Sequence, residues 1–399
     1  MYGNFVYHNA IENENAYGFN TSGIRLAITA GKAEIFNNVV YHTGGSGIYT
    51  DAETRAGDQI HIYGNTVSYC GQAGVAAYKT RGADGVGGVG YVYRNEISYC
   101  DRLAGQTGGA GNAACGIHFN DQAESGVDPA RPFIKWYCYE NHVHHCQAPA
   151  SPRNEDSGGI ALDFNANRVE VFRNLIHDNW GKGVYIYNAD RCNVYGNILY
   201  ANDSGITVSA LSTGGETAHD NQIYNNTLYM NYNGDDYGPG YDCEILFGMN
   251  SHRVSIKNNI LYAHPGGYAY YLFPGSSGLA VDRNCVYKDS GAPCYSSTQG
   301  GRTWLQWQAL GFDLSGINVA PGFVNAAARD FRLAPSSPCI DNGTALPSPF
   351  DTAFSTNQAP FPYPTVGQGT AGAGWEMGAF TFIDGATLNG VEWIIPTGR

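Results

Sequence analysis

The sequence predicts an all-β protein: a single-stranded right-handed parallel β-helix of about ten coils with an irregular C-terminal extension. Two recurring phrases, one built on asparagine and one on glycine, carry this prediction together with the composition. The chain has 399 residues, of which 53 are Gly and 29 are Tyr, and only 14% are charged. A hydrophobic share of 43% is enough to bury a large core and excludes a disordered chain.

The asparagine phrase reads apolar-aromatic-x-Asn-x-apolar and recurs ten times at a mean step of about 31 residues. Its asparagines are Asn4, Asn38, Asn65, Asn95, Asn141, Asn174, Asn197, Asn226, Asn259 and Asn284. The residue two positions after each asparagine is always Val, Ile or Leu. The steps vary in length, which favours short strands joined by loops of free length over a helical repeat.

The glycine phrase, Gly followed by Ile or Val, fills the gaps between the asparagines. The stretch Gly183–Tyr187 alternates with period two, which is typical of a strand with one buried face. Each repeat therefore holds at least two short strands. Asparagine side chains on stacked turns can hydrogen-bond from coil to coil, which predicts a parallel β-helix. The general preference for right-handed crossovers favours the right-handed form.

The cysteines give no pattern typical of a metal site. Cys70, Cys100 and Cys146 lie five residues after ladder asparagines, where other coils carry Asn, so we expect an internal stack. Neighbouring coils lie ~4.8 Å apart, which permits a Cys70–Cys100 disulfide without requiring one. No zinc-type spacing occurs. The dense histidines His142, His144 and His145 suggest a metal, but His142 and His144 occupy strand positions next to the ladder. We therefore interpret them as ordinary surface residues and expect no metal and no cofactor.

An aromatic column lies two residues before the asparagines, on the expected outer surface. It comprises Tyr2, Phe36, Tyr63, Tyr93, Tyr139, Phe172, Tyr195 and Tyr224. Stacked rings could form a track for sugars or a lateral contact with another copy of the chain. They could equally stabilise the sheet under a partial cover of loops.

The two phrases resemble those of right-handed parallel β-helix repeat proteins of the pectate-lyase-like superfamily, over about residues 1–290. The segment Asp330–Gly343 resembles the C-terminal closing region of many secreted members. This resemblance implies an extracellular or cell-surface, carbohydrate-active protein, with a polysaccharide as partner. We therefore divide the chain into coils (1–290), closing coils with a short helix near Thr303–Leu310 (291–345) and an irregular extension (346–399). Because residue 2 already lies in the repeat, we expect a capping segment or partner at that end.

The candidate site lies on the glycine-phrase strands, where the second and fourth residues after Gly point outward. His118 has alanines as its neighbours in this column, which suggests a recess over the imidazole. The expected substrate-binding residues are Arg25, Tyr49, Asp51, Tyr78, Lys79, Asn120 and Tyr185. Long inserts at 101–115, 121–135 and 147–157 are expected to form the walls of a cleft.

Hydrolysis of a glycosidic bond needs two carboxyl groups, roughly 5–10 Å apart depending on stereochemistry. Asp163 is the best first member because its strand position faces outward. Its partner could be Asp121 on the neighbouring coil, or Glu155 or Asp156 in the preceding turn. His118 could orient or protonate Asp163. These aspartates could instead cap turns, as Asp commonly does.

Two alternatives remain open. A lyase or epimerase would use His118, Tyr187, Lys79 or Arg25 at a uronic acid, with a Ca²⁺ ion possible for a lyase. A non-catalytic adhesive, tailspike-like or fibre-forming protein would self-associate through the aromatic column or the helix ends. The net charge of −13 argues against nucleic acid, against an anionic membrane surface and, less strongly, against a polyanionic substrate.

Overall fold

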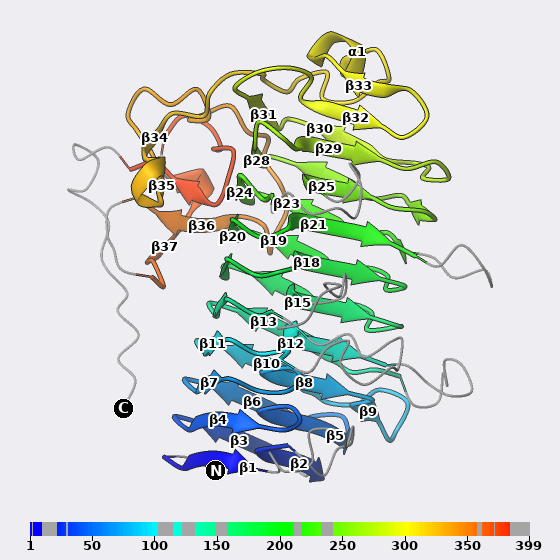
Figure 1. The fold of residues 1–399 in the computed structure, drawn as a ribbon, viewed down its shortest axis with the longest axis vertical. Coiled ribbons are helices and arrows are strands. Elements are labelled where there is room, and N and C mark those ends of the chain that lie inside the picture. Colours follow the sequence, from blue (N-terminus) through cyan, green and yellow to red (C-terminus); the bar gives the residue numbers. More distant parts are fainter. Residues whose placement is uncertain are drawn as a thin grey trace.

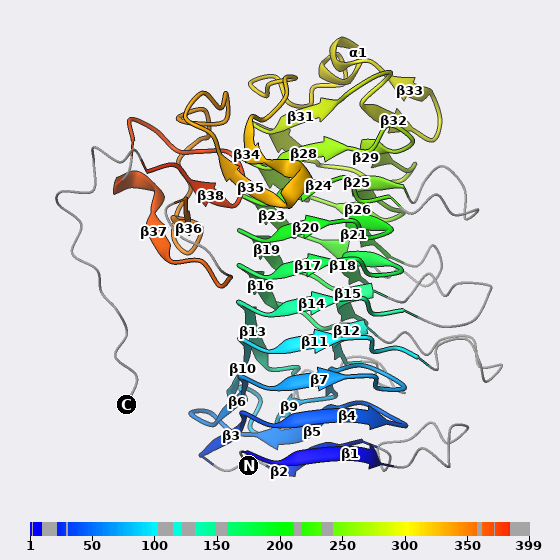
Figure 2. The same ribbon diagram turned by 60° about the vertical axis from the view of Figure 1, so that its left-hand side comes forward.

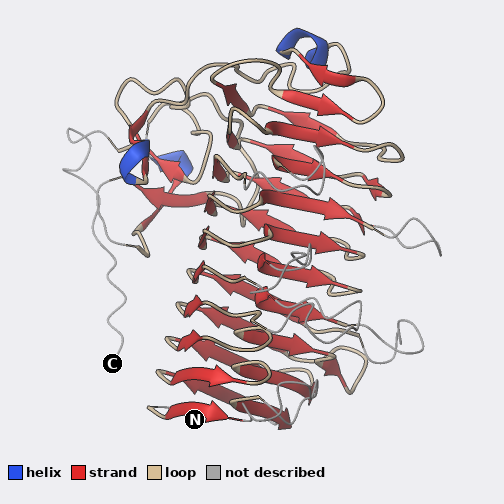
Figure 3. Cartoon of the chain, viewed as in Figure 1, coloured by secondary structure: helices blue, strands red, loops and turns tan. Residues whose placement is uncertain are grey.

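The structure is a computed structural model that describes residues 1, 3–9, 22–28, 31–102, 115–121, 132–147, 158–210, 218–232, 242–356, 361–370 and 372–383. Three long sheets run side by side along one coiled axis, as Figure 1 shows. Each coil contributes one strand to each sheet, and neighbouring coils pair in parallel. Strand dominates the chain, and Figure 3 shows how little of it is helical.

The asparagine phrase marks two of the three sheets, and the glycine phrase marks the third. Sheet I follows the ladder asparagines and contains β1 (Phe5–Asn9), β4 (Val39–Thr43), β7 (Thr66–Ser68), β11 (Glu96–Ser98), β14 (His142–His144), β17 (Leu175–His177), β20 (Ile198–Tyr200), β24 (Thr227–Tyr229), β28 (Ile260–Ala263) and β31 (Cys285–Lys288). Sheet II precedes them and contains β3 (Lys32–Phe36), β6 (Gln59–Tyr63), β10 (Val89–Tyr93), β13 (Lys135–Tyr139), β16 (Glu170–Phe172), β19 (Asn193–Tyr195), β23 (Gln222–Tyr224), β27 (Ser255–Lys257) and β30 (Ala280–Asp282).

Sheet III carries the glycine phrase. It contains β2 (Ile24–Ile28), β5 (Ile48–Thr54), β8 (Val75–Tyr78), β12 (Cys115–Asn120), β15 (Gly158–Asp163), β18 (Lys182–Tyr187), β21 (Ser204–Ser209), β25 (Cys243–Phe247), β29 (Tyr268–Leu272), β32 (Cys294–Ser296) and the antiparallel β33 (Gly300–Arg302), with β9 (Arg81–Gly82) beside β5. A short pair, β22 (Ala218–His219) and β26 (Ser251–His252), adds a separate parallel contact.

The asparagine ladder is confirmed. The Nδ2 of each ladder asparagine donates to the Oδ1 of the next; the Asn95–Asn141 bond is 2.9 Å long and the Asn141–Asn174 bond 3.0 Å. The residue before most ladder asparagines is left-handed, for example Arg94 at φ 53°. This residue turns the chain from sheet II into sheet I, and the buried amide satisfies the backbone groups at the corner.

The interior is filled by the predicted apolar columns. Val67, Ile97 and Val143 are completely buried on successive coils of sheet I. Cys70, Cys100 and Cys146 are buried with free thiols, so the expected internal stack is confirmed.

The aromatic column forms a continuous stack on the outer face of sheet II. Ring centroids lie 4.8–5.0 Å apart from Phe36 through Tyr63, Tyr93, Tyr139 and Phe172 to Tyr195, with planes within 10° of parallel. Tyr2 lies outside the described residues. At the far end, Phe350 packs edge-on against Tyr195 and Tyr224.

The residues after sheet III close the end of the helix and then fold back along it. Helix α1 (Trp304–Gln308), capped by Thr303, is shorter than the expected range, and Trp307 is fully buried. The returning segment holds β34 (Phe323–Asn325), η3 (Ala326–Ala328), β35 (Asp330–Leu333), β36 (Thr352–Ser355), β37 (Thr365–Gly367), η4 (Gln368–Thr370) and β38 (Phe380–Thr381). Figure 2 shows it beside sheets I and II. Among the described residues, no helix is long and apolar enough to cross a membrane.

Candidate functional site

The register of sheet III brings the predicted site residues onto neighbouring strands. His118 of β12 pairs with Ala76 of β8 on one side and Ala161 of β15 on the other, as the glycine alignment predicted. Asn120 lies between Tyr78 and Asp163 in the same manner. Tyr187 of β18 follows Asp163 in this column. The outer face of β8, β12, β15 and β18 therefore presents these side chains as one surface.

His118, Asn120 and Asp163 form a polar cluster in the centre of this surface. The Oδ2 of Asp163 lies 3.3 Å from the Nε2 of His118 and accepts a 3.1 Å hydrogen bond from the Nδ2 of Asn120. Asn120 Nδ2 and His118 Nε2 are 3.4 Å apart. All three residues are at most 8% exposed. A carboxylate held this way, with an imidazole in contact, is equipped for proton transfer.

Asp121 lies at the end of β12, and its carboxylate contacts Arg81. Its Oδ1 accepts a 2.6 Å hydrogen bond from the Nε of Arg81, and its backbone N–H bonds to the carbonyls of Asp163 and Phe164. Burial raises the pKa of Asp121, and Arg81 only partly offsets this effect. Asp121 and Asp163 thus meet through their backbones, while the Asp121 carboxylate pairs with Arg81, a contact that neither sequence phrase predicts. Glu155 and Asp156 lie outside the described residues.

Tyrosines and cations extend the surface toward the N-terminal coils. The Arg25 Nη2 and Asp51 Oδ2 atoms are 2.6 Å apart, and the guanidinium lies 6.0 Å from the ring of Tyr49. The Nζ of Lys79 lies 5.4 Å from the ring of Tyr78. Among the predicted site residues, Arg25 and Asp51 lie furthest from the polar cluster, with Asp51 about three coils or ~14 Å from Asp163.

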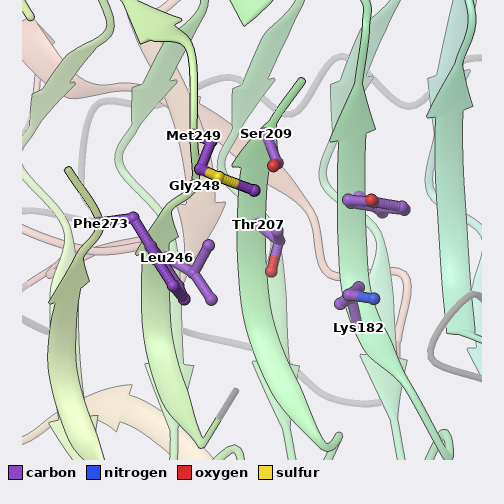
Figure 4. A pocket seen from close by; sticks show the side chains of 8 residues that line it. Lys182, Thr207, Ser209, Leu246, Gly248, Met249 and Phe273 are labelled. Carbon is purple, nitrogen blue, oxygen red and sulfur yellow. The ribbon is translucent and has the colours of Figure 1, made fainter. Parts of the chain in front are cut away.

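The surface continues on the other side of Asp163 into a groove. The rings of Tyr185 and Tyr187 are 5.2 Å apart, and the Nζ of Lys182 lies 4.5 Å from the Tyr185 ring. The groove has a volume of about 90 Å³. Its lining residues are Lys182, Tyr185, Thr207, Ser209, Leu246, Gly248, Met249 and Phe273. Figure 4 shows the Met249 side chain reaching toward the strand that carries Thr207 and Ser209.

Two features of this surface differ from the expectation. The groove lies over β18, β21 and β25, beside the polar cluster, whereas the sequence suggested a recess over His118. Leu246, Met249 and Phe273 were not anticipated because the glycine phrase ends at Gly205, so alignment on glycine does not reach β25 or β29. The continued asparagine spacing could have placed these coils. Most residues of the inserts expected to wall the cleft lie outside the described residues.

Comparison with known proteins supports the fold. The profile of the Beta_helix family, described as a right-handed β-helix region, matches residues 135–241. A search of curated protein sequences found no match. Together with the three parallel sheets, the profile identifies a right-handed parallel β-helix.

Solved structures of similar shape include carbohydrate complexes. XylC with xylose is 12% identical at a TM-score of 0.43, over 76% of this chain and 50% of that one. The tailspike protein of E. coli bacteriophage HK620 with pentasaccharide is 12% identical at a TM-score of 0.41, over 77% of this chain and 58% of that one. A single-residue mutant of that tailspike with pentasaccharide is 13% identical at a TM-score of 0.44, over 80% of this chain and 58% of that one. The chain thus spans between half and three fifths of the length of these structures.

Proposed function

We propose that this right-handed parallel β-helix protein binds a polysaccharide along the outer face of sheet III and hydrolyses a glycosidic bond there. The observation that carries the proposal is the contact of Asp163 with His118 and Asn120 in the middle of a tyrosine-lined face. A polysaccharide substrate is consistent with a place outside the cell or at its surface.

The face suits an extended sugar polymer. The partly exposed Tyr78, Tyr185 and Tyr187 offer flat rings for stacking on both sides of the polar cluster, and the buried Tyr49 packs beside Tyr78. Thr207 and Ser209 in the groove offer hydroxyls that can donate to and accept from sugar hydroxyls. Because the strands repeat every ~4.8 Å, the same kinds of contact recur along the axis.

The polar cluster supplies the chemistry. Asp163 acts as the carboxylate that attacks the sugar or activates water, and Asn120 fixes one of its oxygens by donating to it. His118 contacts the same oxygen and positions the carboxylate. Asp121, whose backbone bonds to that of Asp163, serves as the second carboxyl group, and the burial that raises its pKa favours its proton-donating form.

Digestion of a polysaccharide panel, read by mass spectrometry, tests this proposal. The wild type should release fragments that carry an added water and a new reducing end. Asp163→Asn should lower the rate at least ~100-fold with the fold intact by circular dichroism, since it removes an acid–base group. Asp121→Asn should also lower this rate, whereas the control Asp289→Asn, at an exposed residue directly after β31, should not.

The alternatives give different results in the same assay. A product that is an unsaturated uronide, detected by its ultraviolet absorbance, would show that the bond is cleaved by elimination and not by hydrolysis. Binding without any product would leave a non-catalytic adhesive role. Full activity in Asp163→Asn would remove the assigned mechanism.

A further inference from the structure

Four histidines and two carboxylates meet on the outer face of sheet I, away from the surface described above. They come from β11, β14, β17 and the residues that follow β14 and β17: Glu96, His142, His144, His145, His177 and Asp178. The register explains the gathering, because Glu96 pairs with His142 and His144 pairs with His177 across adjacent coils. From the sequence, His142, His144 and His145 were expected to be ordinary surface residues, and His177 was not singled out.

Hydrogen bonds to the carboxylates fix the ring tautomers of two of the histidines. His142 Nδ1 lies 2.8 Å from Glu96 Oε2, and His177 Nδ1 lies 2.7 Å from Asp178 Oδ2. An ionised carboxylate only accepts hydrogen bonds, so each neutral ring carries its proton on Nδ1. In both rings the Nε2 atom is then left with its lone pair.

These two lone pairs point at each other. The Nε2 atoms of His142 and His177 are 2.7 Å apart, a distance that is repulsive unless a positive charge is shared between them. The second pair of rings repeats the arrangement in part: His144 Nε2 lies 2.6 Å from Glu96 Oε1, while its Nδ1 faces the Nδ1 of His145 at 2.7 Å. Carboxylate-bound histidines with free, converging nitrogens are the usual outer shell of a metal site.

We propose that this cluster binds a divalent transition-metal ion of the class that prefers imidazole, with Zn²⁺ as its representative, through the Nε2 atoms of His142 and His177. Two groups of closely spaced ligand atoms flank this pair: those of Glu96, His142 and His144 lie within 4.8 Å of one another, and so do those of His145, His177 and Asp178. With neutral imidazoles the two carboxylates carry a charge of about −2, which a divalent cation balances. Tetrahedral zinc places two nitrogen ligands about 3.3 Å apart, so a small separation of the two rings admits the ion.

The ion would join the coils of β14 and β17 at the border of the returning C-terminal segment. Phe361 lies 6.1 Å from the His142 ring, and the Arg329 guanidinium lies 4.9 Å from the ring of Tyr200, which stacks on His177. His142 and Glu96 keep side-chain exposures of 28% and 44%, so the site is open to an ion from solution.

Zinc titration of the full chain, stripped beforehand with a chelator, tests the proposal. Isothermal titration calorimetry should show stoichiometric binding of Zn²⁺ by the wild type. The double variant His142→Ala/His177→Ala should weaken binding at least ~100-fold, and Asp178→Asn about 10–100-fold, as expected for an orienting carboxylate. The matched control His61→Ala removes a histidine of sheet II that stacks on Tyr91, and it should leave the affinity unchanged.

Circular dichroism verifies that each variant is folded; should the double variant fail to fold, Asp178→Asn decides, because its side chain is 41% exposed and its loss should spare the fold. Equal zinc affinity in wild type, Asp178→Asn and His61→Ala would overturn the proposal. So would the lack of stoichiometric binding by the wild type, which would leave the cluster as a proton-sharing network.

Discussion

Asp313 ends the asparagine ladder with a carboxyl group in place of an amide. Its Oδ1 accepts a 2.8 Å hydrogen bond from Asn284 Nδ2, and its Oδ2 accepts from the indole nitrogen of Trp307 at 3.3 Å. The residue is completely buried. Burial raises the pKa of Asp313 from 3.8 to about 6, although its hydrogen bonds oppose the change. Below about pH 6 the last coil therefore favours the protonated form of Asp313.

This raised pKa predicts a specific pH dependence of stability. The folded state holds the proton up to about pH 6, whereas the unfolded chain loses it near pH 4, so Asp313 destabilises the fold as pH rises through this window. The free energy of unfolding falls by at most about 3 kcal/mol through this effect, and the fall is complete above pH 6.

Urea unfolding of wild type and Asp313→Asn at pH 4 and pH 7 measures this pH-dependent loss of stability. The variant places an amide N–H against Trp307 and should be less stable at both pH values, but the difference between wild type and variant should shrink from pH 4 to pH 7. A difference that stays constant with pH would contradict the assignment.

At the candidate site, the sequence predicted positions better than contacts. The columns through His118 and Asp163 followed from the glycine alignment, because period-two alternation fixes which residues share a face. The ion pair of Asp121 with Arg81 could not be anticipated, since Arg81 lies in the short strand β9 outside both phrases. The histidine cluster could have been predicted from the sequence. Glu96 and His142 lie one position after their ladder asparagines and His144 lies three positions after its own, so all three share the outer face of neighbouring strands.

The ladder itself is the element that holds the coils in register. Asn141 donates to Val92 O at 2.9 Å and to Asn174 Oδ1, and its own Oδ1 accepts from the backbone and side chain of Asn95. All of these groups are buried. Removing one amide therefore leaves several buried donors and acceptors without partners, each costing ~1–3 kcal/mol.

Asn141→Ala should lower the free energy of unfolding by about 3 kcal/mol or more, measured by chemical denaturation. Asn193→Ala is a matched control, because Asn193 is a partly exposed residue of β19 whose side chain donates a 3.3 Å bond to Glu170. Its loss should cost less than about 1 kcal/mol. Similar losses in the two variants would argue against a structural ladder.

The sequence predicted sheets I and II more completely than sheet III. An asparagine with an apolar residue two positions later marks nearly every coil. The strands of sheets I and II lie directly after and before this asparagine, so their positions can be predicted from it. The glycine phrase requires a small residue where the next coil packs closely; a Cβ on Gly159 would lie 2.5 Å from the carbonyl of Gly183. Strands β25 and β29 begin without that glycine, which is why the phrase missed them.

At the scale of the whole molecule, the C-terminal segment leaves one long face for a polymer. It covers the far part of sheets I and II: Phe350 packs on Tyr195 and Tyr224, and Phe331 on Tyr200 and Tyr229. These contacts depend on side chains more than 100 residues apart, which no local pattern reveals. Sheet III carries the groove and the polar cluster, so we expect the substrate there.

The measurement that tests this central claim most directly is the affinity of inactive Asp163→Asn protein for long oligosaccharides of the polysaccharide identified by the panel. Tyr78 and Tyr185 lie on opposite sides of the cluster, three coils or ~14 Å apart. In the Asp163→Asn background, Tyr78→Ala and Tyr185→Ala should each weaken binding about tenfold through lost ring stacking. Tyr63→Ala, in the aromatic stack of sheet II, should leave the affinity unchanged. Weaker binding in Tyr63→Ala, with unchanged binding in both sheet III variants, would contradict the account.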